Sequence, residues 1–301
     1  MKDKAQACVL ASFAGDALAL GAHWIYDTDR IARDIGRMET YRDPAGDSYH
    51  PTKKKGEFTH YGDQALVLLE SLAASRRFDA EDFSRRWQRL FDGYAGYRDQ
   101  ATRATLENLS QGKPFREAGS SSNDLSAAVR IAPLVYALRG DEEALVKAAR
   151  VQASLTHTDG LTLDAAEFLA RVALRVLGGA PPPAAVQEVL RDHFTGTAVE
   201  HAVHRGLDSC TQDSITAIKA FGQDCHSPHA LPAVIHLVCS HEDDLRDALV
   251  TNVMAGGDSA ARGMAVGMVL GAHLGMRAVP GEWMQGLKRR QQIEALLERI
   301  G

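Results

Sequence analysis

A glycine turn followed by a helix brings three reactive side chains close together. Gly256 and Gly257 precede Asp258 and Ser259, and Arg262 follows Asp258 by four residues. Because residues four apart lie on one helix face, we expect the carboxylate and the guanidinium to point the same way. A helix start also has free N–H groups and N-capping side chains. The segment therefore predicts either a polar binding site at a helix start or an ordinary capped core helix.

The helix after this turn has a glycine at every fourth position. These glycines are Gly263, Gly267, Gly271 and Gly275. Four-residue steps follow one ridge of a helix, so this ridge carries almost no side chains. Each glycine costs about 1 kcal/mol relative to alanine in a helix interior. We therefore expect a neighbouring backbone to approach this ridge very closely.

A second group of chemistry-bearing residues lies between positions 225 and 241. Its possible metal ligands are Cys225, His226, His229, His236, Cys239 and His241. A zinc ion would need four of them converging in a tetrahedron. Their spacing matches no common zinc pattern, and residues 228–238 have the pattern of an amphipathic helix, which spreads them over more than one face. The pattern favours a helix over a zinc site.

The composition is that of a globular protein. The chain has 301 residues, 45% of them hydrophobic and 24% charged, and a formal net charge of -5. The negative charge argues against nucleic acid as a partner, and no apolar stretch is long enough to cross a membrane without a charge. The four cysteines lie far apart without a Cys-x-x-Cys, which indicates reduced thiols and predicts a cytoplasmic location.

Helical periodicity dominates the chain, and alternating strand patterns are almost absent. The expected helices cover residues 63–74, 79–91, 123–138, 141–155 and 159–177. Ser240 and Asp243 predict a capping box before a further helix at Leu245. The fold class is therefore all-α, a compact multi-helix bundle with a single domain over residues 1–301. Three irregular stretches, 42–62, 112–123 and 255–259, lie beside buried helices, where sites are usually found.

Five short motifs, taken in order, are similar to those of a known family. They are Gly15-Asp16-Ala17-Leu18, Gly56-Glu57-Phe58-Thr59, Arg130-Ile131-Ala132-Pro133-Leu134, Thr156-His157 and Gly256-Gly257-Asp258-Ser259. The chain resembles the ADP-ribosylglycohydrolase family, and more closely its J1-crystallin-like branch. The resemblance implies an all-α bundle of that family's type. It also implies hydrolysis of the glycosidic bond between ADP-ribose and an acceptor, assisted by two magnesium ions.

This chain departs from the family's pattern where the metal ligands are expected. The usual Thr-Asp-Asp-Thr falls on Thr59-His60-Tyr61-Gly62, the usual Asp-Thr-Asp-Thr on Asp258-Ser259-Ala260-Ala261, and an acidic residue on His23. Magnesium requires oxygen ligands in near-octahedral geometry. Only Thr59 and Asp258 remain as metal ligands, and the charge of Arg262 opposes a cation beside them. We therefore expect no required cofactor, or a single weakly held magnesium ion.

The remaining polar residues still predict a site for an ADP-ribose-like ligand. Arg262 can offer a bidentate fork to a phosphate, or serve only as a partner of Asp258. Residues 119–123 offer hydroxyls and N–H groups to a pyrophosphate, or only a serine cap. The residues expected to bind ligand are Asp16, Ser121, Ser122, Asn123, His157, Ser259 and Arg262.

Acid–base chemistry is expected from residues that titrate near neutral pH or are carboxylates. The expected catalytic residues are His23, His60, Asp63 and Asp258. Two hypotheses follow. The first is a hydrolase that cleaves an N- or O-glycosidic bond of an ADP-ribosyl or related ribosyl substrate with a degenerate magnesium site. The second is a non-catalytic relative that binds ADP-ribose or is structural, like a crystallin. Both predict that residues 56–63 and 256–262 meet in one site.

Overall fold

The described elements are all helices, as the periodicity predicts. The computed structural model describes residues 2–301, and within them the only strand-like pairings are two isolated bridges. In chain order the helices are α1 (Lys2–Ala19), α2 (Thr28–Arg30), η1 (Ile31–Ile35), α3 (His60–Ser75), α4 (Ala80–Leu90), α5 (Gln100–Ser110), α6 (Ser126–Val129), α7 (Ala132–Leu138), α8 (Glu142–Ser154), α9 (Gly160–Leu177), α10 (Pro182–Val189), η2 (Leu190–Phe194), α11 (Ala198–Asp208), α12 (Ser214–Phe221), α13 (Ser227–Ser240), α14 (Leu245–Met254), α15 (Ser259–Leu274), η3 (Met276–Ala278), α16 (Gly281–Gly286) and α17 (Arg290–Ile300).

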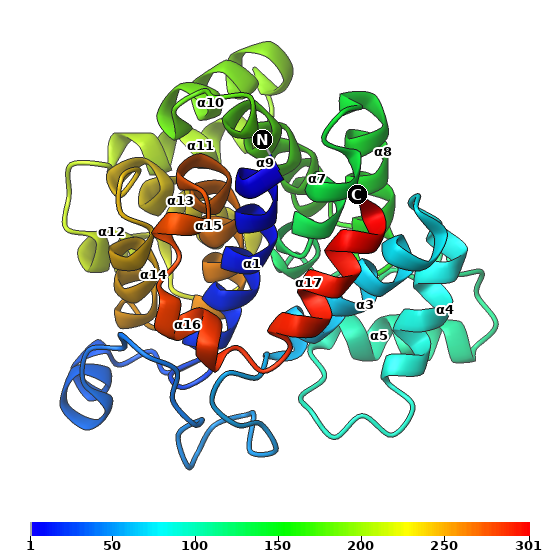
Figure 1. Ribbon diagram of the computed structural model, residues 1–301, viewed down its shortest axis with the longest axis horizontal. Coiled ribbons are helices and arrows are strands. Elements are labelled where there is room, and N and C mark those ends of the chain that lie inside the picture. Colours follow the sequence, from blue (N-terminus) through cyan, green and yellow to red (C-terminus); the bar gives the residue numbers. More distant parts are fainter. Residues whose placement is uncertain (1) are drawn as a thin grey trace.

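Two helices at the centre of the molecule, α1 and α15, pack backbone to backbone (Figure 1). A Cβ atom added at Gly267 would lie 2.2 Å from the carbonyl oxygen of Ala11, and one at Gly271 would lie 2.4 Å from that of Ala7. Glycine at every fourth position of α15 thus meets small residues at every fourth position of α1. The expected close approach of a second backbone is confirmed for Gly263, Gly267 and Gly271, and that backbone is α1. Gly275 lies just past the end of α15 and has a φ of 78°.

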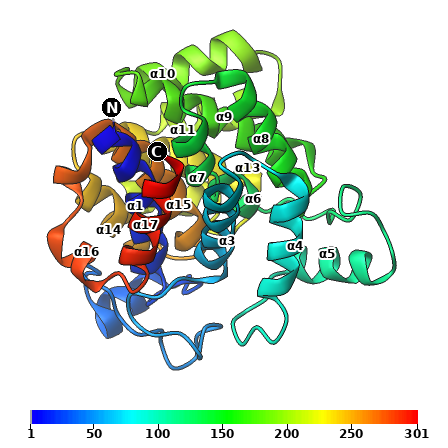
Figure 2. The same ribbon diagram turned by 45° about the vertical axis from the view of Figure 1, so that its right-hand side comes forward.

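The other helices surround this pair and bury a continuous apolar core. Helices α9, α13 and α14 pack against α15, while α7 packs against α1. Helix α3 is buried on most sides, as expected, and contacts α4, α7 and α17 (Figure 2). Aspartate side chains cap α4, α8 and α9 at the predicted positions, Asp79, Asp141 and Asp159.

Two predicted elements are wrong in detail. The helix expected over 123–138 is broken into α6 and α7, because Pro133 has no N–H to donate and its ring would clash with the preceding turn. The expected capping box is also absent. Asp244 caps α14 by accepting the N–H of Asp247, whereas Ser240 ends α13 and donates its hydroxyl to the carbonyl of His236.

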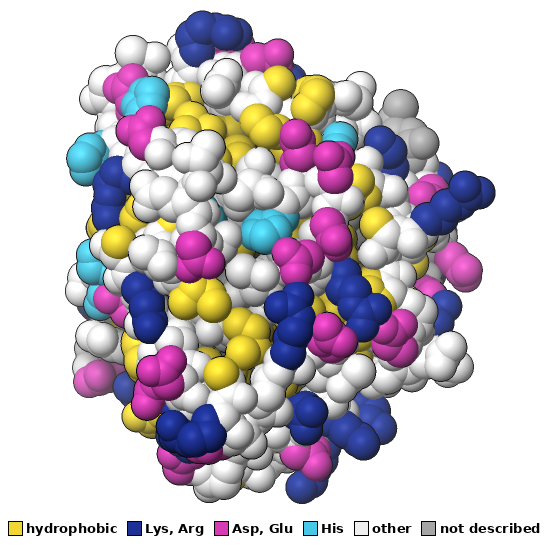
Figure 3. All heavy atoms as spheres, turned by 90° about the vertical axis from the view of Figure 1, so that its left-hand side faces the viewer, with side chains coloured by type: hydrophobic (Ala, Val, Ile, Leu, Met, Phe, Trp, Pro, Cys, Tyr) yellow, Lys and Arg dark blue, Asp and Glu magenta, His cyan; other side chains and the backbone are white. Residues whose placement is uncertain are grey.

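The irregular segment 36–59 runs beneath the C-terminal end of α1 and leads into α3 (Figures 1 and 2). The surface carries charges of both signs, interspersed over the face shown in Figure 3. None of the helices within residues 2–301 combines the length and the apolar character needed to cross a lipid bilayer.

Candidate active site

The starts of α3 and α15 meet at Asp258. The hydroxyl of Tyr61 donates to Oδ2 of Asp258 at 3.0 Å, and Nδ1 of His23 lies 3.7 Å from its Oδ1. Oδ1 also accepts the N–H of Ala261 and so caps α15. Segments 56–63 and 256–262 therefore meet as predicted. Burial raises the pKa of Asp258 to about 6, which places a proton-exchanging group near neutral pH.

A second buried carboxyl, that of Asp16, holds the start of α3 against α1. It accepts the backbone N–H of Thr59 at 2.8 Å and the hydroxyl of Thr59 at 2.5 Å. The same hydroxyl accepts the N–H of Tyr61 and caps α3. Burial raises the pKa of Asp16 to about 7, more than the two hydrogen bonds lower it. The hydroxyl of Thr59, a predicted metal ligand, is thus engaged with protein groups.

Three histidines beside Asp258 form a cluster that we call the imidazole trio: His23, His50 and His60. Their ring centroids lie 5.3 to 6.5 Å apart, and each residue is at most 2% exposed. Nε2 of His60 lies 3.1 Å from Oδ2 of Asp99, but no ring nitrogen of the trio makes a hydrogen bond of ordinary geometry. A buried polar group without a partner costs about 1–3 kcal/mol, so the trio lowers the free energy of unfolding.

Burial keeps two rings of this cluster, those of His23 and His50, uncharged. It lowers the pKa of His23 well below the ordinary value, and nearby His50 and His60 lower it further. It also lowers the pKa of His50 to about 3. At neutral pH these two rings are therefore neutral imidazoles, each with one donor and one acceptor nitrogen.

Three larger rings cover the trio and form what we call the aromatic collar: Trp24, Tyr49 and Tyr97. Their centroids lie 4.8 to 5.6 Å apart with edge-to-face geometry, and Trp24 stacks on His23 at 4.3 Å. Tyr49 is 58% exposed, so the collar reaches the surface. Trp24 has a φ of 65°, a strained conformation for an aromatic residue, and its N–H donates to the carbonyl of Gly257 at 2.9 Å.

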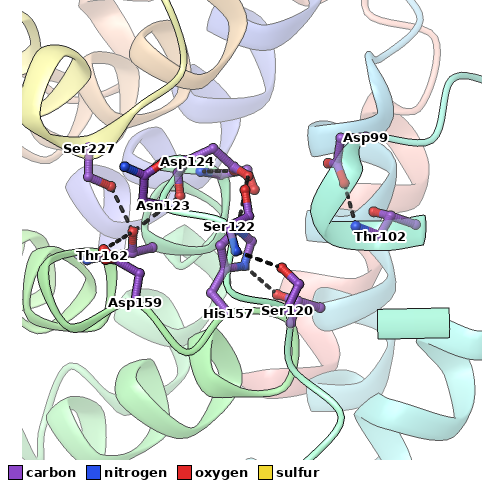
Figure 4. Close-up of polar contacts among 12 residues, drawn as sticks. Asp99, Thr102, Ser120, Ser122, Asn123, Asp124, His157, Asp159, Thr162 and Ser227 are labelled. Carbon is purple, nitrogen blue, oxygen red and sulfur yellow. Dashed lines mark hydrogen bonds and ion pairs between the residues drawn. The ribbon is translucent and has the colours of Figure 1, made fainter. Parts of the chain in front are cut away.

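A separate carboxylate–imidazole pair lies in the loop before α6. Nε2 of His157 lies 3.1 Å from Oδ2 of Asp124, which also accepts the hydroxyl of Ser122 at 2.6 Å (Figure 4). Burial alone would raise the pKa of Asp124, but His157 and the Ser122 hydroxyl lower it below the ordinary value. Asn123 is also engaged, because its Oδ1 lies 2.6 Å from Nδ1 of His226. Ser121 is exposed beside them.

Arg130 links this pair to α3. Its guanidinium is fully buried and donates to Gln64 and Gln152 at 2.7 Å each and to the hydroxyl of Thr156 at 2.6 Å. Because Arg130 has only donors, the Thr156 hydroxyl is free to donate to Nδ1 of His157, 2.9 Å away. That arrangement leaves the N–H of His157 on Nε2, facing Asp124.

Arg262 lies where the sequence places it but not in an open position. Its guanidinium is fully buried and donates to Oδ1 of Asn252 at 3.0 Å and to the carbonyls of Gly256 and Gln223 at 2.5 and 3.2 Å. No ion pair joins Arg262 to Asp258 within the described chain. The geometry shows Arg262 holding the glycine turn, and its role as an anion contact stays a prediction.

Two further predicted residues lie at the edges of the site. The carboxylate of Asp63 accepts hydrogen bonds from Nζ of Lys53 and from the hydroxyl of Tyr94, both at 2.5 Å. Ser259 is buried, and its hydroxyl has no partner. The sequence prediction missed His50, Tyr97 and Asp99, which lie in irregular segments, and Asp124, which lies in the loop before α6 where a helix was expected.

The residues present do not fit a pair of magnesium ions. Among residues 2–301, no three His, Cys, Asp or Glu side chains are grouped so that they could hold a metal ion. At position 61 the family's pattern has a carboxylate, whereas this chain has Tyr61, whose hydroxyl donates a hydrogen bond to Asp258. The histidines between 225 and 241 are used elsewhere. For example, His236 bonds to the hydroxyls of Ser209 and Ser214.

Comparison with known proteins identifies the family. The sequence profile of ADP-ribosylglycohydrolases matches residues 1–301. The chain belongs to the ADP-ribosylglycohydrolase family. Within this family it is 25% identical to the ADP-ribosyl-[dinitrogen reductase] glycohydrolase of Rhodospirillum rubrum, over 99% of this chain and 97% of the relative.

Another relative is not named for an activity. The chain is 22% identical to crystallin J1A of Tripedalia cystophora, over 99% of this chain and 96% of the relative. Among solved structures, an ADP-ribosylglycohydrolase-related protein complex matches with a TM-score of 0.79 and 26% identity, over 99% of this chain and 97% of that one. These matches confirm the family and the fold that the motifs predict.

Proposed function

We infer that this protein hydrolyses the glycosidic bond between an ADP-ribosyl or related ribosyl group and its acceptor, without requiring magnesium. The observation that carries this inference is Asp258. It is fully buried at the start of α15, within reach of Tyr61 and His23, and burial raises its pKa to about 6. A carboxyl group with a pKa near neutral can take and return a proton during each turnover.

The other buried groups support roles around that carboxyl. Asp16 fixes the start of α3 through Thr59, which sets the position of Tyr61. Tyr61 orients the Asp258 carboxyl by donating to one oxygen. In the loop before α6, exposed Ser121 and the nearby backbone remain for a phosphate-bearing part of the ligand, because Ser122 is bonded to Asp124 and Asn123 to His226 (Figure 4).

The alternative is a non-catalytic protein that binds ADP-ribose or is purely structural. It is supported by the similarity to crystallin J1A and by the replacement of carboxylates with His60, Tyr61 and Ala260. Structural decay alone would not account for the buried imidazoles of His23 and His50, whose ring nitrogens make no hydrogen bond, since these cost stability. The cytoplasmic location remains a prediction.

The direct test is release of ADP-ribose from peptides that carry ADP-ribose on arginine, through an N-glycosidic bond, or on serine, through an O-glycosidic bond. In buffer containing EDTA, we expect the wild type to act on at least one of them. Asp258→Asn should lower the rate by about 100-fold or more, because the carboxyl no longer exchanges a proton.

Asp141→Asn is the matched control, because Asp141 caps α8 in the same way and is exposed. Its rate should equal that of the wild type. No release from either peptide by the wild type would exclude the hydrolase and leave the non-catalytic alternative.

A further inference from the structure

Two cysteines that are far apart in the sequence meet where α11 packs against α13. A Cβ atom added at Gly206 would lie 2.7 Å from that of Ile235, so the two segments approach closely there. Cys210 and Cys239 each lie four residues, about one helical turn, beyond that contact. The thiol of Cys239 donates a hydrogen bond to Sγ of Cys210. The proposed function uses neither thiol.

Neighbouring bonds fix the end of α11 beside this pair. Sγ of Cys210 lies 3.4 Å from the carbonyl oxygen of Gly206, and the hydroxyl of Ser209 lies 2.7 Å from Nδ1 of His236. A disulfide needs sulfurs about 2.05 Å apart and Cα atoms about 4.4–6.8 Å apart. Two thiols that already touch on closely packed segments can reach this geometry by rotation about their Cα–Cβ bonds.

The two thiols of the pair differ in reactivity. The hydrogen bond from Cys239 lowers the pKa of Cys210, whereas the same bond and burial raise the pKa of Cys239. Because the thiolate is the nucleophile, Cys210 is the thiol that attacks first and Cys239 the one that follows. Burial raises the pKa of Cys8 and of Cys225, which makes both of them less reactive.

A small molecule can reach the pair from the surface. Cys210 lines a surface cavity of about 440 Å³ together with Gln212, Ser240 and His241. Cys210 and Cys239 are both partly exposed, whereas Cys8 is fully buried in α1. Oxidation of exposed, activated thiols is selective for such positions. The cavity is therefore a route for a small oxidant to Cys210.

We propose that Cys210 and Cys239 form an oxidation site at which a hydroperoxide links the end of α11 to α13 through a reversible disulfide. The Cys210 thiolate attacks the peroxide, forming an S–O bond and breaking the O–O bond. The alkoxide or hydroxide that leaves takes up the proton that Cys210 lost.

The second step closes the disulfide. Sγ of Cys239 attacks the sulfenic acid on Cys210, forming the S–S bond and breaking the S–O bond, and the departing hydroxide leaves as water with the Cys239 proton. The net reaction oxidises two thiols to one disulfide and reduces one hydroperoxide to an alcohol, or to water, and a second water. A thiol reductant reverses it by thiol–disulfide exchange.

Peptide mapping of the full chain tests the site. The protein is treated with hydrogen peroxide, its remaining thiols are alkylated, and disulfide-linked peptides are identified by mass spectrometry. We expect a bridge between Cys210 and Cys239 in most molecules, free thiols at Cys8 and Cys225, and full reversal by dithiothreitol. The bridge closes a loop over residues 210–239 in the unfolded chain, so it should raise the midpoint of thermal unfolding by about 3 °C or more.

Three variants separate the roles of the thiols. Cys239→Ser can still donate a hydrogen bond to Cys210 but cannot close the bridge, so dimedone should label a sulfenic acid at Cys210. Cys210→Ser should give neither a bridge nor a labelled Cys239. Cys225→Ser is the matched control and should form the bridge as the wild type does.

Three results would overturn the site. One is a peroxide-treated wild type in which Cys210 and Cys239 remain free thiols. Another is a bridge that joins other cysteines or two molecules. The third is a bridged protein that unfolds at the same temperature as the reduced protein or below it. None of these measurements depends on glycosidic-bond hydrolysis, so the proposed function is tested separately.

Discussion

Single buried ionisable groups decide how this site responds to pH. In the folded protein the pKa of Asp258 is about 6, whereas an unfolded aspartate has a pKa of about 3.9. The folded state therefore holds this proton to higher pH. The stability that Asp258 contributes in this way is fully present below about pH 4 and is lost as the pH rises through about 6.

Asp258→Asn removes that dependence and should therefore gain stability relative to the wild type as the pH rises. Between pH 4.5 and 7.5 the difference in unfolding free energy should move in favour of the variant by about 1–2 kcal/mol. Urea unfolding at the two pH values measures it. The exposed cap Asp141 is the control, since Asp141→Asn should move much less. If the difference in unfolding free energy between Asp258→Asn and the wild type is the same at both pH values, the raised pKa of Asp258 is contradicted.

Arg262 is expected to act on stability more than on anion binding. Its removal leaves the oxygens of Asn252 and Gly256 without a buried donor, whereas the carbonyl of Gln223 still accepts the N–H of Asp258. Arg262→Met should therefore lower the unfolding free energy by about 2 kcal/mol or more, since each stranded group costs about 1–3 kcal/mol. Exposed Arg85 is the control, and Arg85→Met should stay within about 0.5 kcal/mol.

The contrary result is informative at this position. Arg262→Met could instead fold with wild-type stability and lose its affinity for ADP-ribose. That result would support the sequence prediction that Arg262 contacts an anion. The sequence shows that Asp258 and Arg262 share a helix, but not which neighbours surround each side chain. The bonds from Arg262 to Asn252 in α14 and to the loop carbonyls of Gly256 and Gln223 depend on tertiary packing and could not be predicted from spacing.

At the scale of elements, the contact between α1 and α15 is the most constrained part of the fold. The sequence alone predicts a close backbone neighbour for the glycine ridge, because nothing else explains glycine at every fourth position of a buried helix. It does not identify the neighbour, since Ala7, Ala11 and Gly15 are unremarkable in an alanine-rich segment.

Gly267→Ala tests that contact. The added methyl group would lie 2.2 Å from the carbonyl oxygen of Ala11, so the two helices must separate. We expect a loss of about 1–3 kcal/mol of unfolding free energy, as in overpacked cores. Gly160→Ala is the matched control, because Gly160 begins α9 with no atom within 4 Å of the added carbon. It should be neutral or slightly stabilising. A Gly267→Ala variant as stable as wild type would contradict the packing.

Element boundaries show where prediction from sequence ends. Side-chain caps at Asp79, Asp141 and Asp159 are local signals, and each is found in place. The break before α7 was also visible in the sequence as Pro133, but the apolar period on both sides masked it. His50 and Tyr97 could not be predicted, because they reach the site from irregular segments whose course depends on the whole fold.

At the scale of the whole molecule, the family's bundle is retained while the chemistry at its centre differs from the family's pattern. The starts of α3 and α15 meet as the motifs predict. Tyr61 and His23 lie against the remaining carboxyl of Asp258, and the ring of His50 stacks on those of His23 and His60. That one domain spans residues 1–301 remains a prediction. The central claim is that this site works without magnesium.

Titration of the wild type with ADP-ribose, once in EDTA and once in magnesium at matched ionic strength, tests that claim most directly. We predict the same dissociation constant in both buffers within about threefold, because no three His, Cys, Asp or Glu side chains among residues 2–301 are grouped as a metal site. Binding that requires magnesium, or that strengthens by about tenfold or more when magnesium is added, would contradict it.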